Sequence, residues 1–121
     1  LAVFPWSPLA QGFLTGKYTR EGDLPDESTA SDSEGWEDRY LTPDNFDALD
    51  VLRAVAEEVD ASLPQFALAY HLHHPDITAP IIGARTVDQL EENLGAADVT
   101  LSEDQFERLA VSKAGPYAHL G

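Results

Sequence analysis

The sequence predicts a parallel α/β fold, because two short apolar segments alternate with segments of helical periodicity along its 121 residues. Residues 1–6 and 77–82 are largely apolar and have no helical period, which is typical of buried strands. A long polar stretch and two helical patterns separate them, and two more helical patterns follow. The expected order is strand, long loop, two helices, strand, helix, helix.

Two such strands cannot form a closed sheet, so part of the sheet must come from elsewhere. A TIM (β/α)8 barrel needs about 250 residues and eight β/α units, of which this chain would hold about two. The chain also contains no Met and begins inside the first predicted strand. We therefore expect a fragment of a longer protein; a processed chain or a misplaced gene start would give the same pattern.

Four helix starts can be read from capping signals. Thr42-Pro43 places a capping hydroxyl before a proline at the first helical position, and the apolar spacing that follows predicts a helix through about Asp60. The segments 62–65, 86–89 and 102–105 each have Ser or Thr followed three residues later by Gln, which is a capping box. They predict three further helices.

The segment 20–45 is predicted to be an acidic surface loop. Ten acids and a single base, Arg39, lie between residues 21 and 47, together with several Gly, Pro and Ser residues. Loops of this length in compact domains are usually functional or disordered.

The charge balance excludes several classes of partner. The net charge is -15, with 22 acidic and 7 basic residues, so no nucleic acid or anionic membrane is expected to bind. Because the acids are spread along the chain, we interpret them as a halophilic surface, with an acidic mesophilic protein as the alternative. There is no Cys, no apolar run long enough to span a bilayer and no signal peptide, which predicts a soluble, cytoplasmic protein.

The first candidate site follows the first predicted strand. Trp6 could stack on a flat ring, while Ser7, Gly12 and Lys17 could face a phosphate at the end of the strand. The alternative is a tryptophan in the core followed by a tight turn.

The second candidate site follows the second predicted strand. Residues 83–85 end in an arginine next to a helix start, where an anion would be favoured. Gln89, Glu92 and Asn93 share one face of that helix and could address a ribose or an adenine. Alternatively, Gln89 only closes the capping box and the other two are solvated. The histidines at 71, 73 and 74 end a helix, and we do not predict a metal site there.

Taken together, these segments resemble a known family. WSPLAQGFLTGKY (6–18) closely resembles the segment after the seventh barrel strand of aldo/keto reductases, in particular the branch with potassium channel β subunits and general-stress reductases. PIIGARTVDQLEENL (80–94) resembles the segment after strand eight, and QFALAY (65–70) the helix before it. The resemblance implies that residues 1–121 are the last two β/α units of the barrel plus a C-terminal helix.

The resemblance also implies a binding site for NADP(H), with NAD(H) possible because many relatives have Arg at the position of Gln89. Trp6 would stack on the nicotinamide, the residues after it and Lys17 would line the pyrophosphate, and residues of the second segment would hold the adenosine end. The implied cofactor-binding residues are Trp6, Ser7, Pro8, Leu9, Ala10, Gln11, Gly12, Lys17, Gly83, Ala84, Arg85, Gln89, Glu92 and Asn93.

The family's catalytic Asp, Tyr, Lys and His belong to earlier strands, so no catalytic residue is assigned in this chain. In the family, hydride passes from the nicotinamide to a carbonyl while the Tyr donates a proton. We expect the cofactor-binding part of a reductase for small-molecule carbonyls, inactive without the N-terminal barrel portion. The alternatives are a non-catalytic dinucleotide-binding or regulatory protein and a remnant of a split gene.

Overall fold

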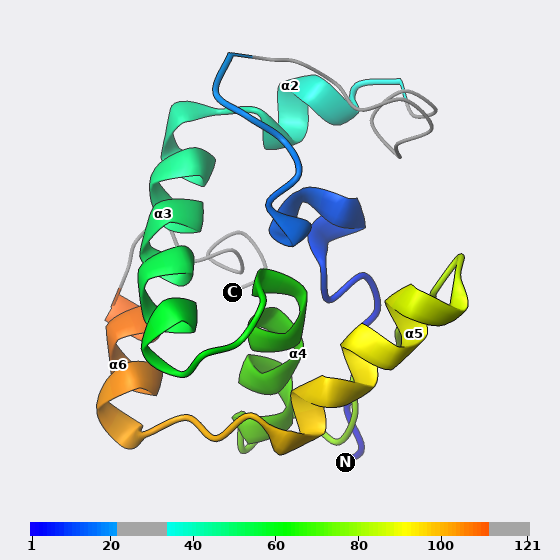
Figure 1. Ribbon diagram of the computed structural model, residues 1–121, viewed down its shortest axis with the longest axis vertical. Coiled ribbons are helices and arrows are strands. Elements are labelled where there is room, and N and C mark those ends of the chain that lie inside the picture. The colour runs from blue at the N-terminus through cyan, green and yellow to red at the C-terminus, as the bar shows by residue number, and fades with distance from the viewer. Residues whose placement is uncertain (22–33, 112–121) are drawn as a thin grey trace.

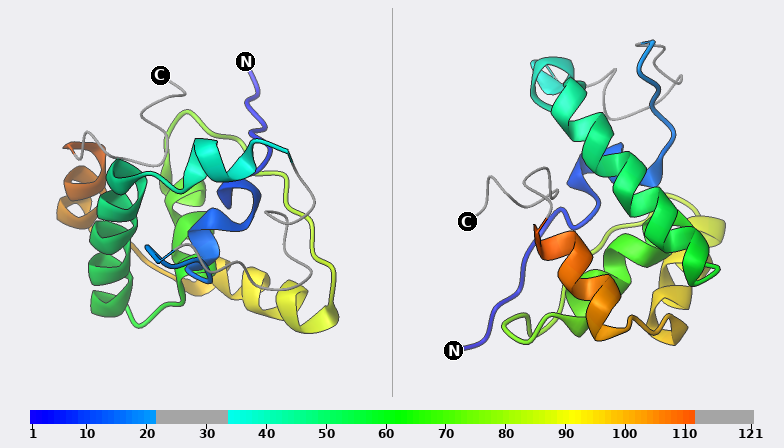
Figure 2. Two further views of the ribbon diagram at one scale, coloured as in Figure 1. Left: turned by 90° about the horizontal axis from the view of Figure 1, so that it is seen from above. Right: turned by 90° about the vertical axis from the view of Figure 1, so that its left-hand side faces the viewer.

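Helix α4 (Leu63–His73) lies at the centre of the fold in the computed structural model, which describes residues 1–21 and 34–111. It contacts α3 (Pro43–Glu58), α5 (Val87–Leu94) and two 3₁₀ helices, η1 (Ala10–Thr15) and η2 (Gly95–Asp98) (Figure 1). Helix α6 (Glu103–Val111) packs beside α3, and the left view of Figure 2 shows α4 between α3 and α5.

Three of the four predicted helix starts are confirmed by the capping hydrogen bonds themselves. The Thr42 hydroxyl accepts from the Asn45 N–H at 3.3 Å, at the start of α3. Ser62 and Ser102 each form a full capping box with the glutamine three residues later, at the starts of α4 and α6. These bonds satisfy N–H groups that a helix would otherwise leave unpaired.

The fourth predicted helix start, that of α5, is correct in position, but its predicted capping hydrogen bonds are only partly present. Thr86 caps α5 by accepting from the Gln89 N–H at 3.1 Å. The Gln89 side chain, however, accepts from the N–H of Arg85 and not from that of Thr86. The predicted capping box at 86–89 is therefore only half formed, and the Gln89 oxygen instead fixes the turn before the helix.

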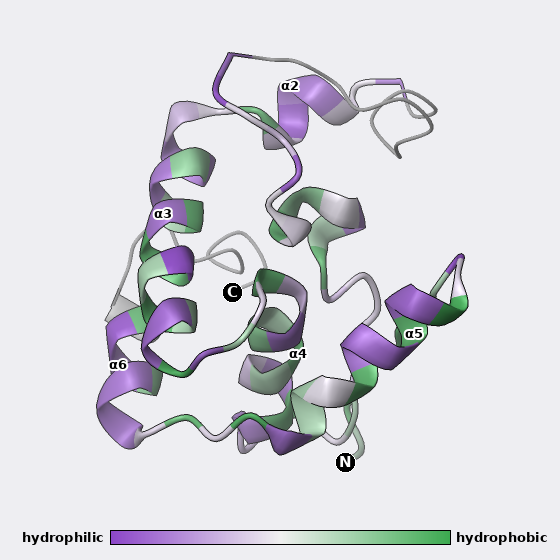
Figure 3. Cartoon of the chain, in the orientation of Figure 1, coloured by the Kyte–Doolittle hydropathy of each residue, from purple (hydrophilic) through white to green (hydrophobic). Residues whose placement is uncertain are grey.

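The predicted apolar face of α3 forms one side of the core. Phe46, Leu49, Leu52 and Val55 are buried there, and Phe66 of α4 is fully buried in the same cluster. Figure 3 shows the hydropathy pattern along the chain, with polar residues on the outer side of α3. Burying side chains of this size stabilises the fold by about 1.5–3 kcal/mol each.

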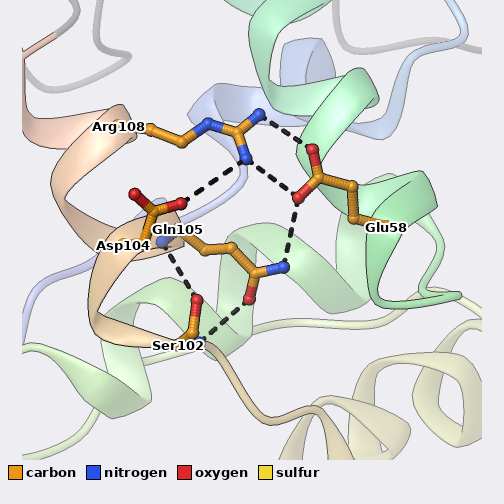
Figure 4. A network of polar contacts seen from close by, with 5 residues as sticks. All are labelled: Glu58, Ser102, Asp104, Gln105 and Arg108. Atoms are coloured by element: carbon orange, nitrogen blue, oxygen red, sulfur yellow. Dashed lines mark hydrogen bonds and ion pairs between the residues drawn. The ribbon is translucent and has the colours of Figure 1, made fainter.

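A surface ion pair joins the end of α3 to α6 (Figure 4). Both terminal guanidinium nitrogens of Arg108, Nη1 and Nη2, donate to Glu58, at 2.9 and 2.8 Å, and Gln105 donates to the same carboxylate at 3.3 Å. These hydrogen bonds hold the pKa of Glu58 below its ordinary value. The groups are exposed, so the pair orients the two helices more than it stabilises them.

The two predicted strands are wrong as regular strands, although their parallel pairing is correct. Residues 1–6 and 77–82 run side by side through Thr78 N–H to Val3 O (2.9 Å), Ile81 N–H to Pro5 O (2.8 Å) and one parallel bridge between Trp6 and Ile81. No strand forms among residues 1–21 and 34–111.

The burial predicted for these segments is also wrong. Phe4, Trp6 and Ile81 expose 54, 76 and 56% of their surfaces. Among residues 1–21 and 34–111 no further strand lies beside the pair to cover it, and Pro5 and Pro80 have no N–H for a ladder. The predicted α/β class is therefore not confirmed, because the described residues form no sheet.

The loop predicted over 20–45 contains a helix, α2 (Trp36–Tyr40). Trp36 is buried, with its ring centroid 4.5 Å from that of Tyr18 and 4.9 Å from that of Tyr40. A surface loop was the wrong prediction here, because an aromatic residue inside an acidic stretch anchors the chain to the core. Residues 22–33 of the predicted loop lie outside the described residues.

Candidate functional site

A pocket of about 640 Å³ lies where the two predicted half-sites meet. The loop into η1 forms one wall, the first residues of α4 a second, and the segment from Ile81 through α5 a third. This volume falls within the range of about 300–1,000 Å³ typical of small-molecule sites. Two segments that lie about 70 positions apart in the sequence thus line one cavity.

Most of the predicted site residues line this pocket, although whether they bind a cofactor remains a prediction. The residues that do so are Ser7, Pro8, Leu9, Gln11, Gly12, Lys17, Gly83, Arg85, Gln89, Glu92 and Asn93. Trp6, Ala10 and Ala84 are not among its lining residues.

Six further lining residues were not predicted: Thr15, Ser62, Leu63, Pro64, Ile81 and Ile82. The residues of 62–64 belong to the start of α4, where helix N–H groups and the positive end of the helix dipole lie. The capping box at 62–65 was a visible signal of a helix N-terminus. Only the packing of α4 against η1 and α5 brings it to the pocket.

The loop that opens η1 has an unusual backbone. Ser7, Ala10 and Gln11 have φ values of 54, 50 and 53°, in the left-handed region, and Gly12 has a φ of 94°. Non-glycine residues in this region cost about 1–3 kcal/mol each and cluster at ligand sites. The N–H groups of Ala10 and Gly12 are used inside the loop, by the carbonyls of Ser7 and Leu9. Gly12 itself lines the pocket, and that it faces a phosphate stays a prediction.

Gly12 and Lys17 lie together in this wall. A Cβ added at Gly12 would lie 3.5 Å from the Lys17 Nζ and 3.6 Å from the Tyr18 hydroxyl. Lys17 is exposed, and its Nζ lies 5.3 Å from the centre of the Tyr18 ring, within reach of a cation–π contact. Packing against the ring places this cation at the pocket.

The α5 wall carries four of the predicted polar residues. The bond from the Arg85 N–H to the Gln89 Oε1 (2.9 Å) closes the turn before the helix. Asn93 is buried and lines the cavity from the last turn of α5. The lining residues include two cations, Lys17 and Arg85, and one carboxylate, Glu92. In a chain of net charge -15, this local balance favours an anionic ligand.

Trp6 lies beside the pocket, and its predicted stacking on the nicotinamide stays a prediction. It pairs with Ile81 beside the pocket, and 76% of its surface is exposed. A ring in this position can still form an aromatic surface next to the cavity. In the described residues, however, it does not form a wall of the cavity itself.

The histidines at the end of α4 use their Nδ1 atoms within the helix. The Nδ1 of His71 and that of His73 each lie 2.8 Å from the backbone carbonyl of the residue four positions earlier. Within 1–21 and 34–111, no group of three His, Cys, Asp or Glu residues is placed to hold a metal ion. Over that same part of the chain, no helix combines the length and the apolar character needed to cross a membrane.

Comparison with known proteins agrees with this arrangement of segments. Residues 1–113 match the sequence profile of the Aldo/keto reductase family. The chain therefore belongs to the aldo/keto reductase family, which implies a TIM barrel fold and whose members typically bind nicotinamide cofactors.

Three relatives illustrate the range of the family. The chain is 36% identical over 101 residues to a probable voltage-gated potassium channel subunit beta of Oryza sativa, covering 82% of this chain and 30% of that protein. It is 41% identical over 108 residues to an uncharacterized oxidoreductase of Mycobacterium tuberculosis (88% and 32%). It is 36% identical over 110 residues to the L-glyceraldehyde 3-phosphate reductase of Escherichia coli K12 (86% and 31%). The chain spans about a third of the length of these relatives.

Proposed function

We propose that this chain supplies the dinucleotide-binding face of an NAD(P)H-dependent aldo/keto reductase that reduces small-molecule carbonyls. In this proposal, the pocket holds the pyrophosphate and adenosine end of the cofactor, and the nicotinamide extends past the pocket toward Trp6. The observation that carries the proposal is the convergence of the η1 loop and the α5 wall on one cavity with two cations.

Each group in the pocket has a role in this proposal. Lys17 and Arg85 would pair with phosphate oxygens, Arg85 in a bidentate manner where the geometry permits. Gln89 and Asn93 would donate to, or accept from, the ribose and the adenine edge. The bound cofactor would supply a hydride to the carbonyl carbon.

The catalytic acid would come from the remaining barrel, since none is assigned here. The exposed apolar residues beside the bridge and along α5 would then pack against the other β/α units; they are Val3, Phe4, Trp6, Ile81, Val87, Leu90 and Leu94. The length of the relatives supports this arrangement, because each has about twice as much additional polypeptide outside the matched region.

A titration followed by NADPH fluorescence tests the proposal. The purified chain is expected to bind NADPH weakly, because the missing barrel would no longer fix the distance between the two walls. It is expected to show no carbonyl-dependent oxidation of NADPH. Tight binding or sustained turnover by the isolated chain would contradict the proposal that the remaining barrel is needed for both. The absence of any binding would contradict the proposed cofactor site.

A non-catalytic, regulatory role is the second candidate, and it is favoured by one observation. A relative with 36% identity is named as a potassium channel subunit, whereas others are named as oxidoreductases. A nicotinamide-binding chain that does not turn over in the presence of its remaining barrel portion would support this second role.

A further inference from the structure

Gln65 does not line the pocket, but its side chain forms hydrogen bonds to two of the pocket walls. This side chain occupies the third position of α4 and is half-buried. Its Oε1 accepts from the N–H of Ser62 at 3.3 Å, closing the capping box at the start of the helix. Its Nε2 donates to the backbone carbonyl of Glu92 at 2.9 Å, across 27 residues of sequence.

One carboxamide therefore joins two walls of the pocket. Ser62 belongs to the α4 wall, whereas Glu92 and the neighbouring Asn93 belong to the α5 wall. The two partners also fix the orientation of the amide, because an N–H needs an oxygen and a carbonyl needs an N–H. Gln65 thus caps α4 with its oxygen and binds the backbone of α5 with its nitrogen.

Gly95 lies against the same Gln65 amide. Its φ of -60° and ψ of -18° are ordinary right-handed helical values that any residue adopts. A Cβ at this position, however, would lie 2.5 Å from Gln65 Nε2 and 3.3 Å from its Cδ. A Cβ here would therefore push the end of the flexible Gln65 side chain away from the Glu92 carbonyl, although the backbone conformation itself would accept any residue.

We propose that Gln65 is a positioning residue that sets the separation of the α4 and α5 walls and holds Glu92 and Asn93 in place for the adenosine part of a ligand. The role in ligand binding rests on the proposed function, whereas the coupling of the walls does not. Gln65 acts through Glu92 and Asn93 and need not touch the ligand.

The substitution Gln65→Glu separates the two contacts. Glutamate still accepts from the Ser62 N–H, as in many capping boxes, but it cannot donate to the Glu92 carbonyl. Gln105→Glu is the control, since Gln105 forms the same capping box with Ser102 in α6 and its Nε2 also donates to a second helix, to Glu58 of α3, away from the pocket. Both variants gain one negative charge.

Hydrogen exchange followed by mass spectrometry measures the coupling directly. In Q65E, exchange of the amides in residues 91–96 is expected to accelerate by about tenfold, the size expected for one lost hydrogen bond, whereas Q105E leaves it unchanged. G95A is expected to have the same effect through its Cβ, although Ala usually stabilises a helical position over Gly. Unchanged exchange in both Q65E and G95A would overturn the proposal.

Binding of two different ligands distinguishes a positioning role from a general loss of stability, because a general loss would weaken both. Q65E is expected to weaken binding of adenosine 2′,5′-bisphosphate several-fold relative to the original chain and to Q105E, with binding of nicotinamide mononucleotide unchanged. An equal loss for both ligands, or the same loss in Q105E, would overturn the positioning role. If the original chain binds neither ligand, the proposed function fails, while the exchange experiment still decides whether Gln65 couples the walls.

Discussion

Two parts of this molecule differ in how far their apolar side chains are buried: the helical half, formed by α3, α4 and α6, and the pocket half, formed by residues 1–12 and 81–94. In α3, α4 and α6, each helix begins with a side-chain cap and buries an apolar face against its neighbours. Along residues 1–12 and 81–94, apolar side chains are exposed and the backbone of the η1 loop is strained. The first half is stabilised by contacts within the chain, whereas the second half lines the pocket and leaves apolar side chains exposed among the described residues.

Substitution of the most buried aromatic residue tests this division most strongly. Phe66→Ala removes a side chain that is 0% exposed, and we expect the free energy of unfolding to fall by about 3–5 kcal/mol. Ile81→Ala, in the pocket half, removes a side chain that is 56% exposed. We expect it to change the free energy of unfolding by less than about 0.5 kcal/mol. Urea unfolding followed by circular dichroism compares the two. Similar losses for both would show that the strand-like pair is as important to stability as the helical core.

The next prediction concerns charge in the pocket half. Arg85→Ala should weaken NADPH binding by about tenfold or more, since a hydrogen bond to a charged group contributes about 1.5–3 kcal/mol. Arg39→Ala removes an exposed cation of α2, which does not line the pocket, and should leave binding unchanged. Isothermal titration at low salt, where screening is weakest, gives both affinities. Equal losses in the two variants would indicate that only the net charge of the chain matters.

A smaller effect is expected from pH in the helical half. Burial lowers the pKa of His71 below its ordinary value of 6.5; the hydrogen bond to the Ala67 carbonyl opposes this shift and the nearby His74 adds to it. The unfolded chain therefore binds a proton more readily than the folded chain. The resulting stabilisation is fully present above about pH 6.5 and is lost as the pH falls through the lower, folded-state pKa.

Melting temperatures measured between pH 5 and 8 test this dependence. Their decrease below pH 6.5 should be smaller in His71→Gln, which removes the buried ring. His73→Gln, on the exposed side of the same helix, should show the same decrease in melting temperature as the original chain. An unchanged pH dependence in H71Q would assign the effect to other groups.

The same contrast explains what the sequence could predict. Capping pairs such as Ser62 with Gln65 lie three residues apart, so the local sequence contains the whole interaction, and the starts of α3, α4 and α6 were found. The segments 1–6 and 77–82 need partner strands to become a sheet, and their regular strand structure was predicted but is absent from the described residues. Helix α2 was missed because one buried aromatic residue, Trp36, outweighs its acidic surroundings.

The candidate site was predicted to a similar extent and for similar reasons. Motif residues near Gly12 and Arg85 could be assigned from the family resemblance, and most line one pocket. The α4 wall could not be assigned, because residues 62–64 reach the pocket only through packing between distant segments. Trp6 lies beside the pocket and is 76% exposed in the described part of the chain, so its predicted stacking on the nicotinamide stays a prediction.

The central claim is that both sequence segments bind one dinucleotide. It can be tested by titrating isotopically labelled chain with NADPH and following the backbone amide resonances by NMR. We predict saturable shifts, with a single dissociation constant, in residues 7–17 and in residues 83–93, while α6 remains unaffected. Shifts confined to one of the two segments, or two different dissociation constants, would contradict the claim.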